Sequence, residues 1–263
     1  MLRPLREIGI VNWWGVYTLV TKEVRRFLKV GMQTVVAPVV TTLLFLAVFT
    51  LALGRSVQTL GGVTFVEFLA PGLVVMAIIQ NAFANTATSM MMAKIQGIIV
   101  DVLMPPLTAG ELTFGYVMGG VVRGLLVGVV VGLAMAVFVP MRITDAGMVV
   151  FHAAGASLML SLMGLLTGIV AEKFDQQSTV TNFVIMPLAF LSGTFYSIER
   201  LPPAWQEVAL YNPFFYIIDG FRYVFIGHSD APLVHGIVVV VTLNVVLWAT
   251  CNYMMFRGYK LKS

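Results

Sequence analysis

The chain alternates long apolar stretches with short polar ones, and this pattern predicts membrane-spanning helices. A helix needs about 20 mostly apolar residues to cross the hydrocarbon layer of a bilayer. Five charge-free stretches reach that length, and a sixth is interrupted only by Arg123. We therefore expect an all-α membrane protein with six transmembrane helices in one domain, residues 1–263. The six predicted spans cover residues 31–54, 65–90, 112–139, 147–170, 177–197 and 232–256.

The segment before the first span predicts a different kind of helix, which lies in the plane of the membrane surface. Over residues 14–30, apolar and basic side chains each recur at helical spacing, so they occupy opposite faces. The expected apolar face consists of Tyr17, Val20, Val24, Phe27 and Leu28, and the basic face of Lys22, Arg25, Arg26 and Lys29. Cations on such a helix lie near anionic lipid headgroups.

Residues 92–111, between the second and third spans, are too apolar for a free loop and too short to cross. Pro105 and Pro106 must break any helix there. We expect a short apolar helix in this loop, and two interpretations of it remain open. It tucks against its own bundle, or it docks into a partner protein.

On the opposite side, residues 203–227 predict a helical element that dips into the outer leaflet and returns. Asn212 is a suitable N-cap for a helix that opens at Pro213. That helix is strongly apolar but too short to cross. Asp219 and Arg222 lie three residues apart on it, so an ion pair between them would lower the cost of holding both near lipid.

Composition supports the membrane assignment and charge sets the orientation. Hydrophobic residues make up 59% of the chain and charged residues only 11%, against about 25% charged in soluble domains. The net charge of +4 does not indicate nucleic-acid binding, because the basic residues concentrate at the chain ends and in loops. Eleven of the 16 fall on the side that holds both termini, which predicts cytoplasmic termini. These eleven are Arg3, Arg6, Lys22, Arg25, Arg26, Lys29, Lys94, Lys173, Arg257, Lys260 and Lys262, against Arg55, Arg142, Arg200 and Arg222 on the other side.

Polar residues inside the predicted spans are candidates for a substrate path. Arg123 lies near the middle of the third span, where an ionisable side chain is expensive unless it is paired or hydrated. Gln80, Asn81 and Asn85 lie in the cytoplasmic half of the second span. For Arg123, a role in the path and a structural role bonded to carbonyls or to Asn81 both remain open.

Small residues predict where helices approach each other closely. Gly120, Gly124, Gly128 and Gly132 lie four apart on one face of the third span. A looser stripe in the fourth span consists of Ser157, Ser161, Gly164 and Gly168. Packing is the expected role, either within the chain or between two copies.

The sequence contains none of the motifs that would indicate an enzyme, a nucleotide site or a metal site. It has no GxxxxGK[ST], no HExxH and no Cys/His cluster, and its one cysteine, Cys251, lies in an apolar run as a core residue. His152 and Ser157 are five apart on one helix and cannot form a nucleophile–base pair. We expect no catalytic residue and no metal in this chain, with Glu67 and His152 exposed to water near the outer interface.

Nearly the whole chain resembles the membrane subunits of type-2 ABC (ABC-2) transporters, in particular YadH-like bacterial inner-membrane permeases. The most specific match is the external segment before the last span, where Ser197 stands at a position that is proline in many members. Its matching residues are Phe190, Leu191, Ser192, Gly193, Phe195, Tyr196, Leu201, Pro202, Asn212, Pro213, Tyr216, Arg222 and Gly227. The start of the third span is similar too, at Gly115, Tyr116, Gly119, Gly120, Arg123 and Gly124.

The resemblance implies a function and partners that the residue pattern alone does not. The loop after the second span looks like the family's coupling helix, which docks on an ATPase, with Lys94, Gly97, Asp101, Leu103, Pro105 and Pro106 as the candidate coupling residues. By this resemblance two permease chains pair, as an expected homodimer, and separate ATPase subunits bind ATP and Mg²⁺. The chain would then export an amphipathic, lipid-linked or drug-like substrate from the bacterial inner membrane.

Two other functions are weighed against this one. A secondary transporter driven by an ion gradient typically shows inverted repeats and several charged midplane sites, whereas this chain shows no repeat and one midplane charge. A membrane scaffold would leave Arg123 and the re-entrant segment unexplained.

Overall fold

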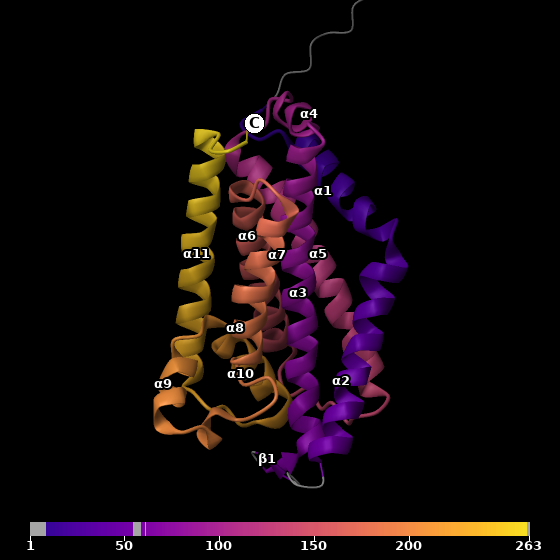
Figure 1. Cartoon of the computed structure of the whole chain (residues 1–263), viewed down its shortest axis with the longest axis vertical. Helices are drawn as coiled ribbons and strands as arrows, with labels where there is room; N and C mark the ends of the chain where they lie inside the picture. The colour runs from indigo at the N-terminus through magenta and orange to yellow at the C-terminus, as the bar shows by residue number, and fades with distance from the viewer. Residues whose placement is uncertain (1–8, 55–58, 61, 262–263) are drawn as a thin grey trace, which may run out of the picture.

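The computed structural model is an elongated bundle of helices that run roughly parallel to its long axis (Figure 1). The structure describes residues 9–54, 59–60 and 62–261. Four basic residues used to predict the orientation, Arg3, Arg6, Arg55 and Lys262, lie outside that part of the chain. The short helix α4 and the C-terminus lie at one end of the bundle, and strand β1 lies at the other. These are called the α4 end and the β1 end.

The chain enters the bundle through a surface helix and a bent span. Helix α1 (Trp13–Leu28) is followed by a π-helical turn, η1 (Met32–Val36), and then by α2 (Ala37–Leu53). A two-residue hairpin, β1 (Thr59–Leu60) and β2 (Val63–Thr64), leads into the next helix.

Helix α3 (Phe65–Ile95) is the centre of the bundle. Thr64 and Glu67 form a capping box at its start, which fixes where the helix begins. It packs most extensively against α5 (Ala109–Ala136) and α6 (Ala146–Val170), with α2 and α10 also in contact. As a result its side chains are buried nearly all round, whereas α2 and α11 (Leu233–Arg257) are mostly exposed at the periphery of the chain.

Small residues allow this close packing, and their neighbours show which helices the glycine stripes contact. A Cβ at Gly124 would lie 2.3 Å from Ser157 Oγ, and one at Gly164 would lie 2.4 Å from the carbonyl oxygen of Phe83. The stripes of α5 and α6 therefore pack against α3 and each other within the chain. Gly132 is different, because a Cβ there would meet nothing within 4 Å.

The predicted fifth span, residues 177–197, is wrong in its extent. The helical run covers α7 (Phe174–Val180), the π-helical turn η2 (Thr181–Ile185) and α8 (Met186–Phe190), and it ends seven residues earlier than expected. In the described part of the chain, five helical runs are long and apolar enough to cross a membrane, and one of them, Met32–Ala52, includes the π-helical turn η1. The run 174–190 has 17 residues, at the lower end of the roughly 17–25 that a crossing needs, so the number of six spans stays a prediction.

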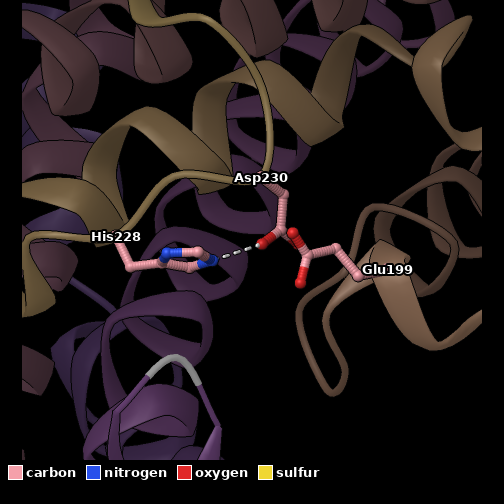
Figure 2. Close-up of side chains that lie close together, drawn as sticks. All are labelled: Glu199, His228 and Asp230. Carbon is pink, nitrogen blue, oxygen red and sulfur yellow. Dashed lines mark ion pairs between the residues drawn. The ribbon is translucent and has the colours of Figure 1, made fainter.

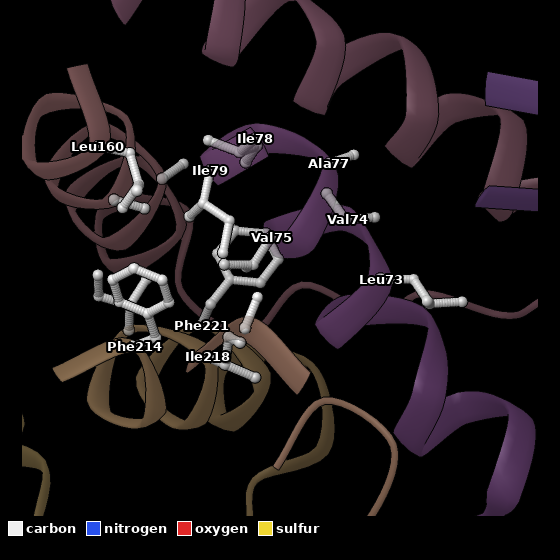
Figure 3. Close-up of a cluster of buried hydrophobic side chains, with 14 of the residues drawn as sticks. Leu73, Val74, Val75, Ala77, Ile78, Ile79, Leu160, Phe214, Ile218 and Phe221 are labelled. Atoms are coloured by element: carbon white, nitrogen blue, oxygen red, sulfur yellow. The ribbon is translucent and has the colours of Figure 1, made fainter. Parts of the chain in front are cut away.

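The segment predicted to be re-entrant forms two helices at the β1 end. They are α9 (Pro203–Leu210) and α10 (Pro213–Ile226), preceded by the 3₁₀ turn η3 (Ile198–Arg200). Asn212 caps α10 as expected, accepting from the Phe214 amide at 3.0 Å, and Gly227 ends it in the left-handed conformation. Helix α10 is largely buried inside the bundle, whereas its depth in the membrane stays a prediction. Figure 3 shows Phe214, Ile218 and Phe221 of α10 facing Val75 and Ile79 of α3 and Leu160 of α6 in one buried cluster.

Two further expectations for this end are corrected by the structure. Asp219 and Arg222 are both buried but, among the described residues, no ion pair joins them. Asp219 instead accepts hydrogen bonds from the Asp230 and Ala231 amides, at 2.9 and 3.2 Å. His152 is only 1% exposed rather than open to water, because it packs directly on Gly220 of α10.

Candidate functional site

The loop helix expected after α3 is α4 (Ile99–Leu103), and it is apolar on both faces. It follows Gly97, whose φ of +72° lets the chain reverse direction. Ile99 and Val102 are buried against the bundle, whereas Val100 and Met104 are 55% and 77% exposed. The buried face confirms that this helix tucks against its own bundle, whereas docking of the exposed face into a partner stays a prediction. An apolar surface of this kind at a bundle end marks an interaction site.

The candidate coupling residues divide between these two faces. Asp101, Pro105 and Pro106 are exposed beside Val100 and Met104. Leu103 is only half-buried and packs against the inner cluster that includes Ile99 and Val102. Val100 and Met104, rather than Leu103, thus form the exposed apolar surface of α4.

Lys94 has a different position from the one the coupling prediction gave it. Its Nζ donates to three carbonyl oxygens at the end of α6, at distances of 2.7 to 3.1 Å. Those acceptors belong to Gly168, Ile169 and Ala171. Lys94 therefore caps the C-terminus of α6, where carbonyls have no partner within the helix.

Helix α1 is attached to the same end of the bundle. The Asn12 amide donates to Glu111 Oε1 at 2.5 Å, and Asn12 Nδ2 donates to the Pro106 carbonyl at 3.3 Å. The start of α1 is thereby tied to the segment between α4 and α5.

The face of α1 that packs against the bundle shares only Phe27 with the apolar face predicted to lie in the membrane surface. The buried residues are Val16, Leu19, Glu23 and Phe27, whereas Tyr17 and Leu28 are exposed. The buried set follows helical spacing, with a carboxylate in line with three apolar side chains. That in-line Glu23 is the sequence signal that predicts a buried acid here.

A polar cluster forms where α1, α3 and α5 meet, and it contains Glu23, Arg26, Asn81, Asn85 and Arg123. Arg26 pairs with Glu23 at 3.2 Å and also donates to the carbonyl and the side-chain oxygens of Asn85, both at 2.9 Å. Arg123 Nη2 donates to Asn81 Oδ1 at 3.0 Å. The structure thus places the predicted residues Asn81, Asn85 and Arg123 in one cluster and adds Glu23 and Arg26, which the sequence interpretation put on the membrane surface or left out.

Several atoms of this cluster are buried without a hydrogen-bond partner among the described residues. They are Glu23 Oε1, Asn85 Nδ2 and Arg123 Nε. A buried polar atom left unpaired costs about 1–3 kcal/mol, so natural proteins rarely gather several in one place. The cluster therefore retains one acceptor and two donors that are unpaired among the described residues and shielded from the outside of the chain.

Asn81 connects the polar cluster to a notch between α2 and α3. This notch has a volume of about 240 Å³ and contains the polar side chains Gln33, Thr41, Thr42, Gln80 and Asn81. Gln80 Nε2 also approaches Met186 Sδ at 3.5 Å, which links the notch to α8. Hydroxyl and amide groups beside apolar ones suit a substrate that is itself amphipathic.

The signature residues of the external segment form a packed structural unit. Arg222, 2% exposed, donates to the Gly193 carbonyl at 2.6 Å and lies 3.8 Å from the centre of the Phe68 ring. Gly193 adopts a φ of +74°, which favours glycine. The segment is thereby held against α3.

The other signature residues also make packing or hydrogen-bond contacts within this unit. Phe195 stacks on Phe49 with ring centres 4.5 Å apart. Asn212 Nδ2 donates to the Leu188 carbonyl at 2.7 Å, and Pro213 is the first residue of α10. The Tyr216 hydroxyl donates to the Leu210 carbonyl at 2.9 Å, whereas Tyr196 and Pro202 line an apolar pocket beside Trp205.

Comparison with known proteins places this architecture in a family. Residues 15–226 match the model of the ABC-2 type transporter family. The chain is 38% identical to the inner membrane transport permease YadH of Escherichia coli strain K12, over 95% of this chain and 98% of that protein. It is also 22% identical to nodulation protein J of Rhizobium meliloti strain 1021, over 85% of each chain.

Proposed function

The chain belongs to the ABC-2 type transporter family, and we propose that it is the permease subunit of an ATP-driven exporter. Family membership makes it a transport permease, and the apolar helices make it a multi-pass inner-membrane protein. The direction of transport, the partner subunits and the substrate class are the proposed part. The substrate is amphipathic, lipid-linked or drug-like, and the energy comes from a separate ATPase that binds ATP and Mg²⁺.

The observation that best supports an ATPase partner is the exposed apolar surface of α4. Val100 and Met104 project from a short helix whose other face is already buried, so the exposed face needs a second cover. The neighbouring Asp101 supplies a charge that can fix the orientation of docking. In this proposal the α4 end is cytoplasmic, as the distribution of basic residues predicts, and both termini lie there.

The proposed substrate path runs beside the notch and the polar cluster. Gln80 and Asn81 face the notch, and Arg123 reaches it through Asn81. The notch lies on the side of the chain formed by α2, which is largely exposed. A second copy of the chain, in a homodimer, would close the path from that side.

The experiment is a tagged pull-down of the full chain from its native membrane in mild detergent, with copurifying proteins quantified. We expect an ATPase with a Walker motif at near-equal amount. Met104→Asp should reduce that amount strongly, whereas Tyr259→Asp, an equally drastic change at the same end of the bundle, should not. An ATPase retained by the Met104→Asp chain would contradict docking on α4.

A secondary transporter remains the second candidate because of one observation, the buried carboxylate of Glu23 beside Arg26. Buried acids inside a membrane bundle are typical of proton-coupled transport. The same pull-down separates the two functions. Absence of any ATPase from a folded chain would favour ion-driven transport and make Glu23→Gln the next variant to test.

A further inference from the structure

Three potential metal ligands meet at the β1 end of the bundle, although they are far apart in the sequence. Glu199 lies in η3, and His228 and Asp230 lie in the loop between α10 and α11. Figure 2 shows the three side chains pointing toward one another from these two segments. One nitrogen or oxygen atom from each lies within 4.8 Å of the other two.

The spacing within this trio suits a tetrahedral metal ion. His228 Nε2 and Asp230 Oδ1 are in ion-pair contact at 3.3 Å, a separation that is also close to the roughly 3.4 Å between neighbouring ligands of Zn²⁺ bound at about 2.1 Å. Glu199 is exposed and can rotate its carboxylate through the remaining distance. An imidazole with two carboxylates is a known type of zinc ligand set, and it is a poor set for Ca²⁺ or Mg²⁺, which prefer oxygen ligands alone.

The carboxylate of Asp230 is held in place from behind, as metal ligands usually are. Its side chain is 2% exposed, and Oδ2 accepts from Ser197 Oγ at 2.8 Å and from the Ile198 amide at 3.0 Å. Because Oδ2 is occupied, Oδ1 remains directed at His228. Hydrogen bonds of this kind fix the direction of a ligand before the metal arrives.

The main chain around the trio is fixed as well. The Asp230 amide donates to Asp219 Oδ1 at 2.9 Å, and the Glu199 amide donates to Ser197 Oγ at 3.3 Å. The carboxylates of Glu199 and Asp230 therefore lie close together, on main chain that hydrogen bonds hold in place. Like charges at this distance repel each other unless a cation lies between them.

We propose that Glu199, His228 and Asp230 bind one transition-metal ion, with Zn²⁺ as the preferred species. The ion links η3 to the α10–α11 loop, so it closes the base of the helical hairpin formed by α9 and α10. Water completes the coordination, since three protein ligands leave one tetrahedral position open. Binding is a property of the permease chain alone and does not depend on the ATPase partner.

The test uses the full chain purified in detergent, treated with EDTA, dialysed and titrated with ZnCl₂ in a calorimeter. We expect one Zn²⁺ per chain at micromolar concentration or below, and a higher melting temperature with Zn²⁺. Co²⁺ at the same site should give a visible absorption band. Millimolar Ca²⁺ or Mg²⁺ should not displace the metal, and displacement by either would overturn the zinc assignment.

Variants locate the site. Glu199→Gln and His228→Ala should each weaken Zn²⁺ binding at least tenfold, and Ser197→Ala should weaken it by about tenfold through loss of orientation. The matched controls are Glu207→Gln in α9 and His235→Ala in α11, which should bind as the unaltered chain does. Elution of each variant as a single monodisperse peak shows that it is folded. No binding by the unaltered chain, or equal binding by Glu199→Gln and His228→Ala, would overturn the proposal.

Discussion

The contact between α3 and α6 allows the sharpest test of the bundle, through the single substitution Gly164→Ala. An added Cβ would lie 2.3 Å from Thr86 Oγ1 and 2.4 Å from the Phe83 carbonyl oxygen. The Phe83 oxygen belongs to the backbone of a helix, so it cannot rotate away. The two helices must therefore move apart to clear the Phe83 oxygen, and the Thr86 side chain must turn to clear its own contact.

The size of the effect follows from these two contacts. Overpacking a close helix contact costs about 1–3 kcal/mol. Turning Thr86 also breaks its hydrogen bond to the Ser161 carbonyl, which is 2.8 Å long and contributes about 1 kcal/mol. We expect a destabilisation of about 2–4 kcal/mol, which lowers the melting temperature by about 5–15 °C in a chain of this size.

The assay is thermal unfolding of the full chain in detergent, followed by intrinsic fluorescence, with Gly132→Ala as the matched control. A Cβ at Gly132 meets nothing within 4 Å, and alanine favours the helix by up to about 1 kcal/mol, so that variant should melt at the same temperature or slightly higher. An unchanged melting temperature for Gly164→Ala, or equal losses in both variants, would refute the assignment of this packing.

Two further predictions concern side chains that the sequence interpretation placed in water or in a partner interface. Lys94→Met should destabilise the chain by about 1 kcal/mol because it leaves the last carbonyls of α6 uncapped. Thermal unfolding measures this loss, with Lys173→Met as the control variant. Gly220→Ala should lower the melting temperature because its Cβ would lie 2.1 Å from His152 Nε2. His152→Ala should restore stability in the double variant, and a lack of rescue would contradict that contact.

The sequence was sufficient for the fold class and for the spans that are unbroken. Length and apolar composition alone identify α3, α5, α6 and α11. The same criterion overextended the fifth span to residue 197, because apolar residues continue into the turns after α8. Hydropathy does not distinguish lipid from the interior of the protein as the surroundings of a residue, so it did not predict that α10 is buried inside the bundle.

The candidate site was predictable only in part. Arg123 and Asn81 stand out as polar residues in apolar spans, and their hydrogen bond is one that the sequence interpretation left open. Glu23 was missed because the basic residues around it indicated a helix on the membrane surface. The trio of Glu199, His228 and Asp230 has no ligand spacing in the sequence, since η3 and the α10–α11 loop meet only in the folded chain.

A π-helical turn precedes each of two helices beside the notch, η1 before α2 and η2 before α8. Each wide turn comes just before a proline near the start of the next helix, Pro38 after η1 and Pro187 after η2, and both features bend helices. Gln33 of η1 lines the notch, and Met186, directly after η2, approaches Gln80 at its edge. We expect rotation of α2 or α8 about these bends to change the width of the notch, because α3 is packed on nearly all sides. The notch thus lies between a central helix fixed by packing and bent helices at the periphery of the chain.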